Sequence, residues 1–191
     1  RWQEKALREA KLYSAWSAPN GPYEEACRGF LTALLEAPEG LALRTRIAEA
    51  AQELAPAGAL NGLAQCLLKM TTPGVPDLYQ GCELWDFSLV DPDNRQPVDF
   101  DGREAFLSQA AALPELLEHW RDGRIKQHLI ARTLELRREY PDLFCRGDYQ
   151  PLALAGSHAE RALAFARRQG TDWLVVVLPR LAAPLLDGSA N

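Results

Sequence analysis

Apolar side chains recur every three or four residues on both sides of residues 72–100, and within that segment the spacing is lost. Such spacing places apolar groups on one face of a helix. Asn20 followed by Pro22 predicts a helix start, and Asp101 predicts another. The pattern predicts helices over about 2–13, 21–36, 41–54, 57–69, 102–112, 114–121 and 124–140.

Three of these helices should each bury one apolar face, because their large aliphatic residues stay in register. The faces expected to be buried are Cys27, Phe30, Leu31, Leu34 and Leu35 on the second helix, Leu43, Ile47, Ala50 and Leu54 on the third, and Leu60, Leu63, Ala64, Leu67 and Leu68 on the fourth.

Composition excludes an all-β fold, because the chain has 31 Leu and 29 Ala but only 6 Val and 3 Ile. Short strands are expected only near the C-terminal end, over 149–154, 161–167 and 173–178. The sequence Gln169-Gly170-Thr171 is typical of a hairpin turn between the last two. We therefore expect a mainly α chain with a small antiparallel β-sheet, organised as a helical region (1–146) and a sheet region (147–191).

Charge and hydropathy exclude several classes of protein. The net charge of −5 argues against a nucleic-acid partner, which usually requires a basic face. No apolar run reaches the ~18–20 residues that span a bilayer, so no membrane partner is expected. The chain opens at Arg1 inside a helical pattern, so we expect a piece of a longer protein.

The four cysteines, Cys27, Cys66, Cys82 and Cys145, form no C-x-x-C pair. This spacing argues against a zinc site, and a chain of this length needs no disulfide framework. Reduced thiols, and hence a cytoplasmic location, are the expectation. His119, His128 and His158 are expected at the surface or in packing roles, and the pairs Arg137-Arg138 and Arg167-Arg168 on solvated faces.

Residues 72–100 combine prolines, carboxylates, an arginine and aromatic side chains. The segment is too long for an ordinary connecting loop, and its aromatic side chains argue against disorder. A short strand should open here into a polar loop, and such groups are suited to recognising sugar hydroxyls and sugar rings. A calcium loop counted from Asp91 fails, because Gln96 and Gly102 stand where Gly and Glu are required. A turn over 91–95 whose side chains satisfy their own backbone stays open.

The run PGVPDLYQGCELWD, followed by SLVDPDNRQPVDF, resembles the maltooligosyl trehalose synthase family of the α-amylase superfamily. The superfamily's segment at the eighth barrel strand reads here as Gly74, Pro76, Tyr79, Gly81 and Glu83. Further similar runs are Arg8 to Lys11, Trp16, Pro19-Asn20, Tyr23-Glu24, Ala57 to Asn61, Gly123 to Lys126, Pro141 to Phe144 and Ala164 to Arg168. Cys82 stands where the family usually has Thr.

This resemblance implies the C-terminal fragment of a (β/α)8-barrel enzyme, with the last barrel strand and the start of a β domain. The family converts the reducing-end α-1,4 link of a maltooligosaccharide into an α,α-1,1 link, and no cofactor is implied. The catalytic carboxylates would precede Arg1, so no catalytic residue is assigned here and the fragment should be inactive. The implied partners are the substrate and the remainder of the parent chain.

Part of the site for the acceptor glucose is expected in the loop. The candidate substrate-binding residues are Tyr79, Gln80, Glu83, Trp85, Asp86, Asp93, Asn94 and Arg95. Tyr79 and Glu83 have a second interpretation as braces of the strand end. Two other functions also stay open: a non-catalytic helical module that binds glucan or protein, and part of an α-amylase-type hydrolase.

Overall fold

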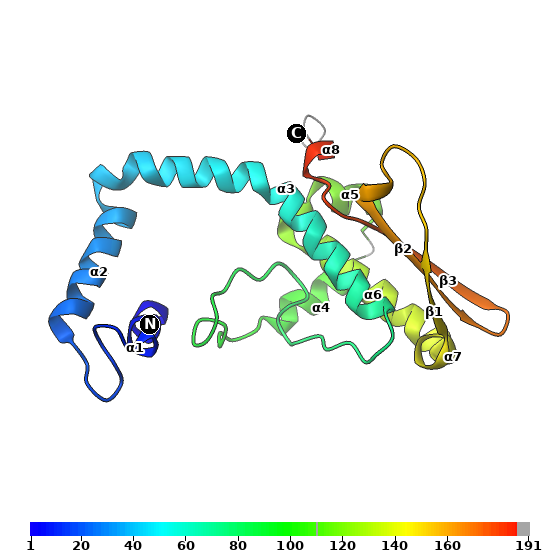
Figure 1. Ribbon diagram of the computed structural model, residues 1–191, viewed down its shortest axis with the longest axis horizontal. Coiled ribbons are helices and arrows are strands. Elements are labelled where there is room, and N and C mark those ends of the chain that lie inside the picture. The colour runs from blue at the N-terminus through cyan, green and yellow to red at the C-terminus, as the bar shows by residue number, and fades with distance from the viewer. Residues whose placement is uncertain (110, 187–191) are drawn as a thin grey trace. The chain divides into compact units, whose positions relative to one another are not determined.

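The computed structural model describes residues 1–109 and 111–186, which form two compact units (Figure 1). Unit 1 comprises residues 1–53 and 87–97, and unit 2 comprises residues 54–86 with the described residues from 98 onward. Helix α3 (Leu41–Thr71) begins in unit 1 and ends in unit 2.

Unit 1 contains α1 (Trp2–Ala10), α2 (Gly21–Glu36), a 3-10 turn η1 (Pro38–Gly40) and the start of α3. The predicted cap of α2 is confirmed, because the Asn20 side chain accepts a hydrogen bond from the Tyr23 amide at 3.2 Å. This side chain satisfies one of the four amides that a helix start leaves without a partner.

A buried carboxylate ties α1 to α2. Arg8 donates from Nε and Nη2 to the two oxygens of Glu24, each at 2.8 Å, and Ser14 donates to the same carboxylate. The Arg8 guanidinium also lies 4.9 Å from the centre of the Trp16 ring. The hydrogen bonds from Arg8 and Ser14 lower the pKa of Glu24 to about 2.

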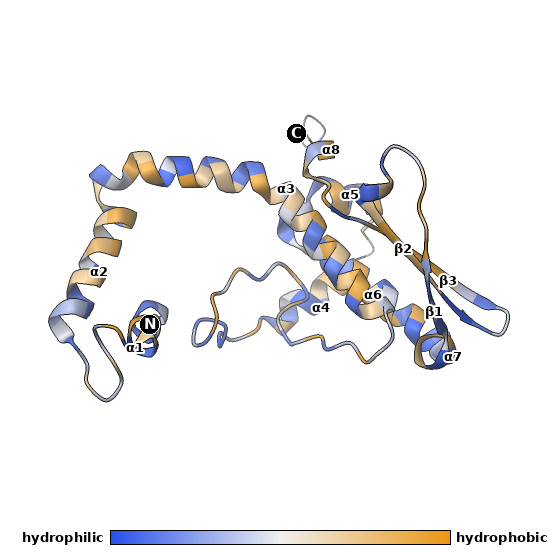
Figure 2. Cartoon of the chain, viewed as in Figure 1, coloured by the Kyte–Doolittle hydropathy of each residue, from blue (hydrophilic) through white to orange (hydrophobic). Residues whose placement is uncertain are grey.

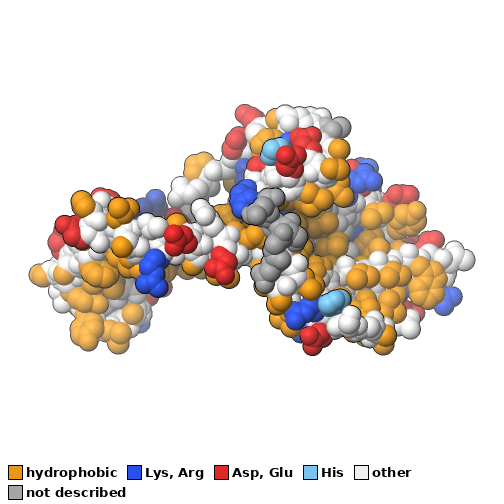
Figure 3. Space-filling model, turned by 90° about the horizontal axis from the view of Figure 1, so that it is seen from above, with side chains coloured by type: hydrophobic (Ala, Val, Ile, Leu, Met, Phe, Trp, Pro, Cys, Tyr) orange, Lys and Arg blue, Asp and Glu red, His pale blue; other side chains and the backbone are white. Residues whose placement is uncertain are grey.

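The apolar faces predicted to be buried in unit 1 are instead exposed, so that prediction was wrong. Phe30 of α2 is 70% exposed and Leu35 is 52% exposed, while Leu43 and Ile47 of α3 are 45% and 54% exposed. Figure 2 shows hydrophobic residues along both helices, and Figure 3 shows such side chains at the surface. Periodicity shows which face is apolar, but burial needs another element to cover it.

Helix α3 also corrects the prediction of two helices, 41–54 and 57–69, because it runs through Pro56 without ending. A proline removes one backbone donor and disfavours a helix interior. Its neighbours at 51, 55, 57 and 59 are all alanine, the residue with the highest helix propensity, so the helix continues on both sides.

Unit 2 contains α4 (Phe100–Ser108), α5 (Leu113–Glu118), η2 (Trp120–Asp122), α6 (Arg124–Glu139), α7 (Pro141–Arg146), η3 (Ala159–Arg161) and α8 (Ala183–Leu186). The cap of α4 is Asp99 rather than the predicted Asp101, since Asp99 Oδ1 accepts from the Gly102 amide at 3.0 Å. The predicted helix 102–112 and the sheet region 147–191 each include residues outside the described ones, at 110 and at 187–191.

The antiparallel sheet is confirmed, with strands β1 (Asp148–Leu152), β2 (Ala162–Gln169) and β3 (Asp172–Pro179) in that order. Gln169 pairs with Asp172 across a two-residue turn in which Gly170 has φ +60°. The central strand β2 buries all residues from Ala164 to Arg167.

The C-terminal half of α3 packs between α6 and the sheet (Figure 1). Cys66 and Met70 join Ile130 of α6 in one apolar cluster, with Leu78 against it. On the other side, Phe165, Val176 and Leu178 of the sheet pack against three α3 residues, Ala64, Leu67 and Leu68. The apolar face predicted for residues 57–69 therefore packs against the sheet, although its residues are only half-buried.

Arg167 is buried, with 1% of its surface exposed, so its predicted place on a solvated face was wrong. Successive residues of a strand point to opposite faces, and Arg167 shares the inner face with Phe165 while Arg168 stays outside. Its guanidinium donates to four carbonyls at 2.9–3.2 Å, those of Thr71, Phe144, Gly147 and Asp148. Burial lowers its pKa.

Arg137 of α6 is also engaged rather than solvated. It donates to the Met70 carbonyl at 2.6 Å and to the Gly74 carbonyl at 3.4 Å, and it lies over the Phe144 ring. The last carbonyls of a helix have no partner within the helix and carry partial negative charge, which two guanidinium groups satisfy. Together Arg137 and Arg167 set the direction in which the chain leaves α3.

Residues 72–99 form turns and extended stretches without a strand, whereas the sequence predicts a short strand there. A strand is defined by hydrogen bonds to a neighbouring strand, and the described residues supply no neighbour for this segment. Its place as the last strand of a barrel stays a prediction.

Replacing Arg167 should destabilise unit 2 strongly. Arg167→Gln leaves several buried carbonyls without donors, so we expect the free energy of unfolding to fall by about 3 kcal/mol or more. Arg168→Gln, one residue away on the outer face, is the matched control and should change it by about 0.5 kcal/mol or less. Chemical denaturation of the two variants measures both values, and equal losses would contradict the role of Arg167.

The Glu24 network should make the stability of unit 1 depend on pH. Because the folded pKa lies below the unfolded one, the carboxylate stabilises the fold above about pH 4.3, and this stabilisation is lost as the pH falls toward 2. We expect Glu24→Gln to lower the melting temperature at neutral pH and to make little difference near pH 2.

Thermal unfolding at both pH values measures this, with Glu25→Gln as the control, because Glu25 forms only an exposed pair with Arg28. A Glu24→Gln effect of equal size at both pH values would contradict the prediction.

Candidate functional site

The first part of the candidate site is the turn over residues 79–83 in unit 2. The Cys82 amide donates to the Tyr79 carbonyl at 3.1 Å, and Gly81 adopts φ +90°. A side chain at Gly81 would lie 3.0 Å from Val98. The backbone conformation therefore favours glycine there, and a side chain would also require the Val98 side chain to shift.

Glu83 braces this turn. Its Oε2 accepts hydrogen bonds from the Gly81 amide at 3.0 Å and from Arg103 Nε at 2.9 Å. Both side chains of the ion pair are largely shielded from solvent. The second interpretation of Glu83, as a structural brace, therefore agrees with its contacts.

Trp85 is anchored by η2 and α6. Its indole Nε1 donates to the Trp120 carbonyl at 2.7 Å, and Lys126 Nζ lies 5.8 Å from its ring centre. Lys126 also donates to the Leu84 carbonyl at 2.9 Å. The half-buried ring is thus held in one orientation, which suits an aromatic side chain that stacks on a ligand.

Gly123 permits this anchoring, because the backbone of Trp85 passes directly over it. Gly123 has φ +83°, and a side chain there would lie 2.8 Å from the Trp85 amide nitrogen. The Trp85 segment can therefore approach the start of α6 this closely because residue 123 has no side chain.

Tyr79, Gln80 and Asp86 are the exposed candidates of unit 2. Tyr79 is 63% exposed. Cys82 Sγ lies 3.7 Å from Asp86 Oδ2, and burial together with this carboxylate raises the pKa of the Cys82 thiol. Among the candidate residues of this unit, these three are the exposed ones.

The other three candidates, Asp93, Asn94 and Arg95, belong to unit 1. Asp93 Oδ2 accepts from the Leu89 amide at 2.7 Å, and the Arg95 guanidinium pairs with Asp91. Lys5 of α1 also donates to Asp91, at 3.1 Å. Side chains of the turn over 91–95 therefore satisfy some of the turn's own polar groups, as the interpretation of this segment as a self-satisfied turn predicted. Asn94 and Arg95 remain exposed.

Three residues that the sequence did not single out hold the candidates in place: Arg103 and Lys126 in unit 2, and Lys5 in unit 1. Each lies on a helix remote in sequence from the residue it contacts. Local spacing carries no signal of such pairs. Among the residues that the structure describes, no group of three His, Cys, Asp or Glu could hold a metal ion.

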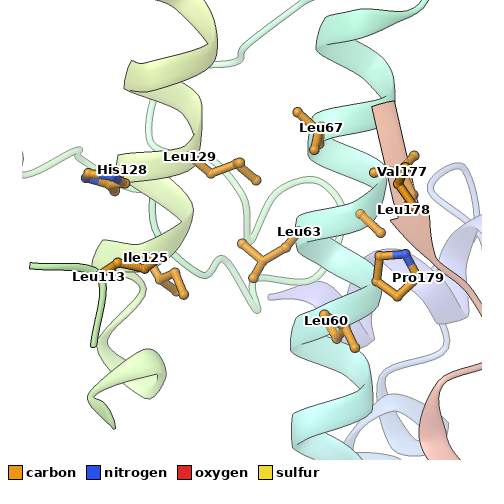
Figure 4. Close-up of a pocket in the computed structure, with 11 residues that line it drawn as sticks. Leu60, Leu63, Leu67, Leu113, Ile125, His128, Leu129, Val177, Leu178 and Pro179 are labelled. Carbon is orange, nitrogen blue, oxygen red and sulfur yellow. The ribbon is translucent and has the colours of Figure 1, made fainter. Parts of the chain in front are cut away.

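A separate groove of about 220 Å³ lies in unit 2 between α3, α6 and β3 (Figure 4). Aliphatic side chains such as Leu60, Leu63 and Leu67 line it, and His128 stands at its side. Sugar recognition needs several polar groups to orient hydroxyls, so this groove is not assigned to a sugar. In the described part of the chain, no helix is long and apolar enough to cross a bilayer.

Comparison with known proteins shows the family to which this sequence is related. No family model matches, but a Mycobacterium tuberculosis protein named "Putative maltooligosyl trehalose synthase" is 40% identical over 176 residues, which is 92% of this chain. The chain is homologous to one part of the maltooligosyl trehalose synthases. It spans about a fifth of that relative's length, 21%.

Solved structures of these synthases share the fold. The maltooligosyltrehalose synthase from Arthrobacter ramosus is 36% identical and matches 97% of this chain with a TM-score of 0.76, over 23% of its own length. A Sulfolobus tokodaii protein described as a hypothetical maltooligosyl trehalose synthase is 30% identical over 92% of this chain, with a TM-score of 0.71 and 22% of its own length covered.

Gly123→Ala should displace the Trp85 segment. We expect a loss of about 1–3 kcal/mol, because the new methyl group meets backbone and the left-handed conformation is strained. Gly58→Ala is the matched control in α3, where a side chain meets open space, and it should stabilise the chain by about 0.5–1 kcal/mol. Denaturation and Trp fluorescence measure both, and a neutral Gly123→Ala would contradict this packing.

Proposed function

We propose that this chain forms the C-terminal part of a maltooligosyl trehalose synthase, which converts the reducing-end α-1,4 link of a maltooligosaccharide into an α,α-1,1 link. The observation that carries the proposal is the 40% identity over 92% of the chain to a protein of that name. The reaction is an intramolecular transglucosylation, and the residues of this chain would require no cofactor for their part in it.

In a retaining mechanism, one carboxylate attacks the anomeric carbon while a second protonates the leaving oxygen. We place these carboxylates on earlier barrel strands of the parent protein, outside this chain. The chain alone should therefore be inactive. Its own carboxylates agree with this assignment, since Glu83 is engaged with Arg103 and Asp93 with a backbone amide.

The freed glucose must turn and offer its anomeric hydroxyl to the covalent intermediate before water reacts there. The protein must therefore hold the glucose in place and exclude water. We propose that the eight candidate residues contribute to this acceptor side, in two groups. Trp85 would supply a fixed ring for stacking, and the exposed Tyr79, Gln80 and Asp86 would supply hydrogen bonds.

The second group would act through Arg95, whose guanidinium is held by Asp91, and through the exposed Asn94. A planar guanidinium suits the hydroxyls of a sugar, since it presents several donors in fixed directions. The bound substrate and the remainder of the parent chain are the proposed partners, and a cytoplasmic location follows from the absence of any need for disulfides.

The exposed apolar residues of α2 and of the first half of α3 support a partner in the parent chain. Phe30, Leu35, Ile47 and Leu54 are each more than half exposed. Extended apolar surface of this kind marks a contact with another protein surface. The relatives are several times longer than this chain, so the remainder of the parent is the proposed cover.

Maltopentaose incubation tests the proposed reaction. With the longer protein that carries this sequence, we expect reducing ends to disappear without matching release of glucose, because an α,α-1,1 link has no reducing end. The chain alone should change nothing. Reducing-end and glucose assays follow both. A gain of reducing ends would indicate hydrolysis and overturn the trehalose assignment, and activity of the chain alone would overturn the placement of the carboxylates.

Arg95→Ala in the longer protein should reduce transfer on the order of tenfold or more, because a hydrogen bond from a charged group is lost. The melting temperature should stay within about 2 °C, since Arg95 pairs at an exposed position. Arg28→Ala removes another exposed arginine of unit 1 and is the matched control. An equal loss of transfer and of stability would contradict the role of Arg95.

A further inference from the structure

Two segments that are distant in sequence meet at a neck in unit 2. We call residues 81–83 and 98–99 the neck. A side chain at Gly81 would lie 3.0 Å from Val98, so the two sides are in close contact. Trp85 and Asp86, two of the proposed acceptor-side residues of unit 2, directly follow the first side of the neck.

Arg103 of α4 joins the two sides of this neck. On one side, its Nη2 donates to the Gly81 carbonyl and its Nε to Glu83 Oε2, both at 2.9 Å. On the other side, its Nη1 donates to the Asp99 carbonyl at 2.9 Å. All three guanidinium nitrogens are therefore in use, and none of these bonds reaches residues 84–97.

The position of Arg103 is itself fixed from α6. Gln127, which is 4% exposed, donates from its side chain to the Arg103 carbonyl at 2.9 Å. Asp99 caps α4 through the Gly102 amide, which places Arg103 at the start of the helix. Contacts within α4 and with α6 thus fix the position of the Arg103 guanidinium beside the neck.

We propose that Arg103 is a positioning residue for transglucosylation: it keeps the neck closed so that Trp85 and Asp86, which directly follow it in unit 2, meet the acceptor glucose in one geometry. This inference rests on the proposed function. Arg103 contacts no proposed sugar ligand other than Glu83. Its loss should therefore loosen the positions of Trp85 and Asp86 without removing the catalytic carboxylates, and water should then compete better for the covalent intermediate.

The geometry of the guanidinium explains why lysine cannot replace it. Three acceptors on two segments require donors spread over a planar fork, whereas an ammonium group is a single point on a flexible chain. Arg103→Lys keeps the charge opposite Glu83 but not the bonds to both carbonyls. It should behave more like Arg103→Gln than like the unmodified protein.

The first arm of the experiment measures neck opening in this chain. In Arg103→Gln, amide hydrogen exchange at Gly81 should accelerate on the order of tenfold, since its acceptor Glu83 loses its own partner. Amides of β2 should be unchanged. Arg132→Gln removes an exposed arginine of α6 and is the matched control. Unchanged exchange at Gly81 would overturn the neck contact.

The second arm measures the ratio of hydrolysis to transfer in the longer protein, with maltopentaose as substrate. Arg103→Gln should raise this ratio on the order of tenfold, because misplacement of about 1 Å is enough to impair an oriented reaction. A loss of folded protein alone would lower both products equally and leave the ratio unchanged. An unchanged ratio with accelerated exchange would overturn the positioning role.

Glu83→Gln provides a second variant if Arg103→Gln folds poorly, because it keeps an oxygen acceptor and removes only the charge. It should raise the ratio less than Arg103→Gln does, and no change in both would overturn the inference. If the unmodified longer protein forms no α,α-1,1 link, the proposed function fails and the positioning role fails with it. The exchange result would then still decide whether Arg103 closes the neck.

Discussion

The C-terminal end of α3 is the point on which the rest of unit 2 depends. Arg167 and Arg137 donate to the carbonyls that this helix leaves without partners, and Arg167 also reaches carbonyls at α7 and β1. The buried guanidinium of Arg167 thus joins α3, α7 and β1. The segment with the family signature begins directly after this point, so its direction is set by these contacts rather than by its own sequence.

The candidate site residues are likewise held by contacts with residues that are distant in the sequence. Trp85 is fixed by η2 and α6, and Glu83 by Arg103 of α4. In unit 1, Asp91 is held by Lys5 of α1. The carboxylates nearest the signature are therefore largely committed to their own scaffold. This commitment agrees with the proposal of an accessory role on the acceptor side, with the catalytic carboxylates outside this chain.

The apolar residues of α2 and α3 differ in burial from one unit to the other. Helix α2 and the first half of α3 have clear apolar faces that stay exposed among the described residues. In unit 2 the corresponding face of α3 is covered, because the sheet and α6 pack on it. The same helical period thus leads to burial in one unit and exposure in the other, and the difference lies in the neighbouring elements.

Sequence alone determined the local elements and the family. Helical spacing predicted most helices, Asn20 predicted a cap, Gly170 predicted the hairpin, and the run from Gly74 to Asp99 indicated the synthases. These features depend on residues close together in the chain. Only the tertiary structure decided that Arg167 is buried and that Arg103 donates hydrogen bonds to both sides of the neck. Those outcomes depend on contacts between residues far apart in sequence, for which local spacing carries no signal.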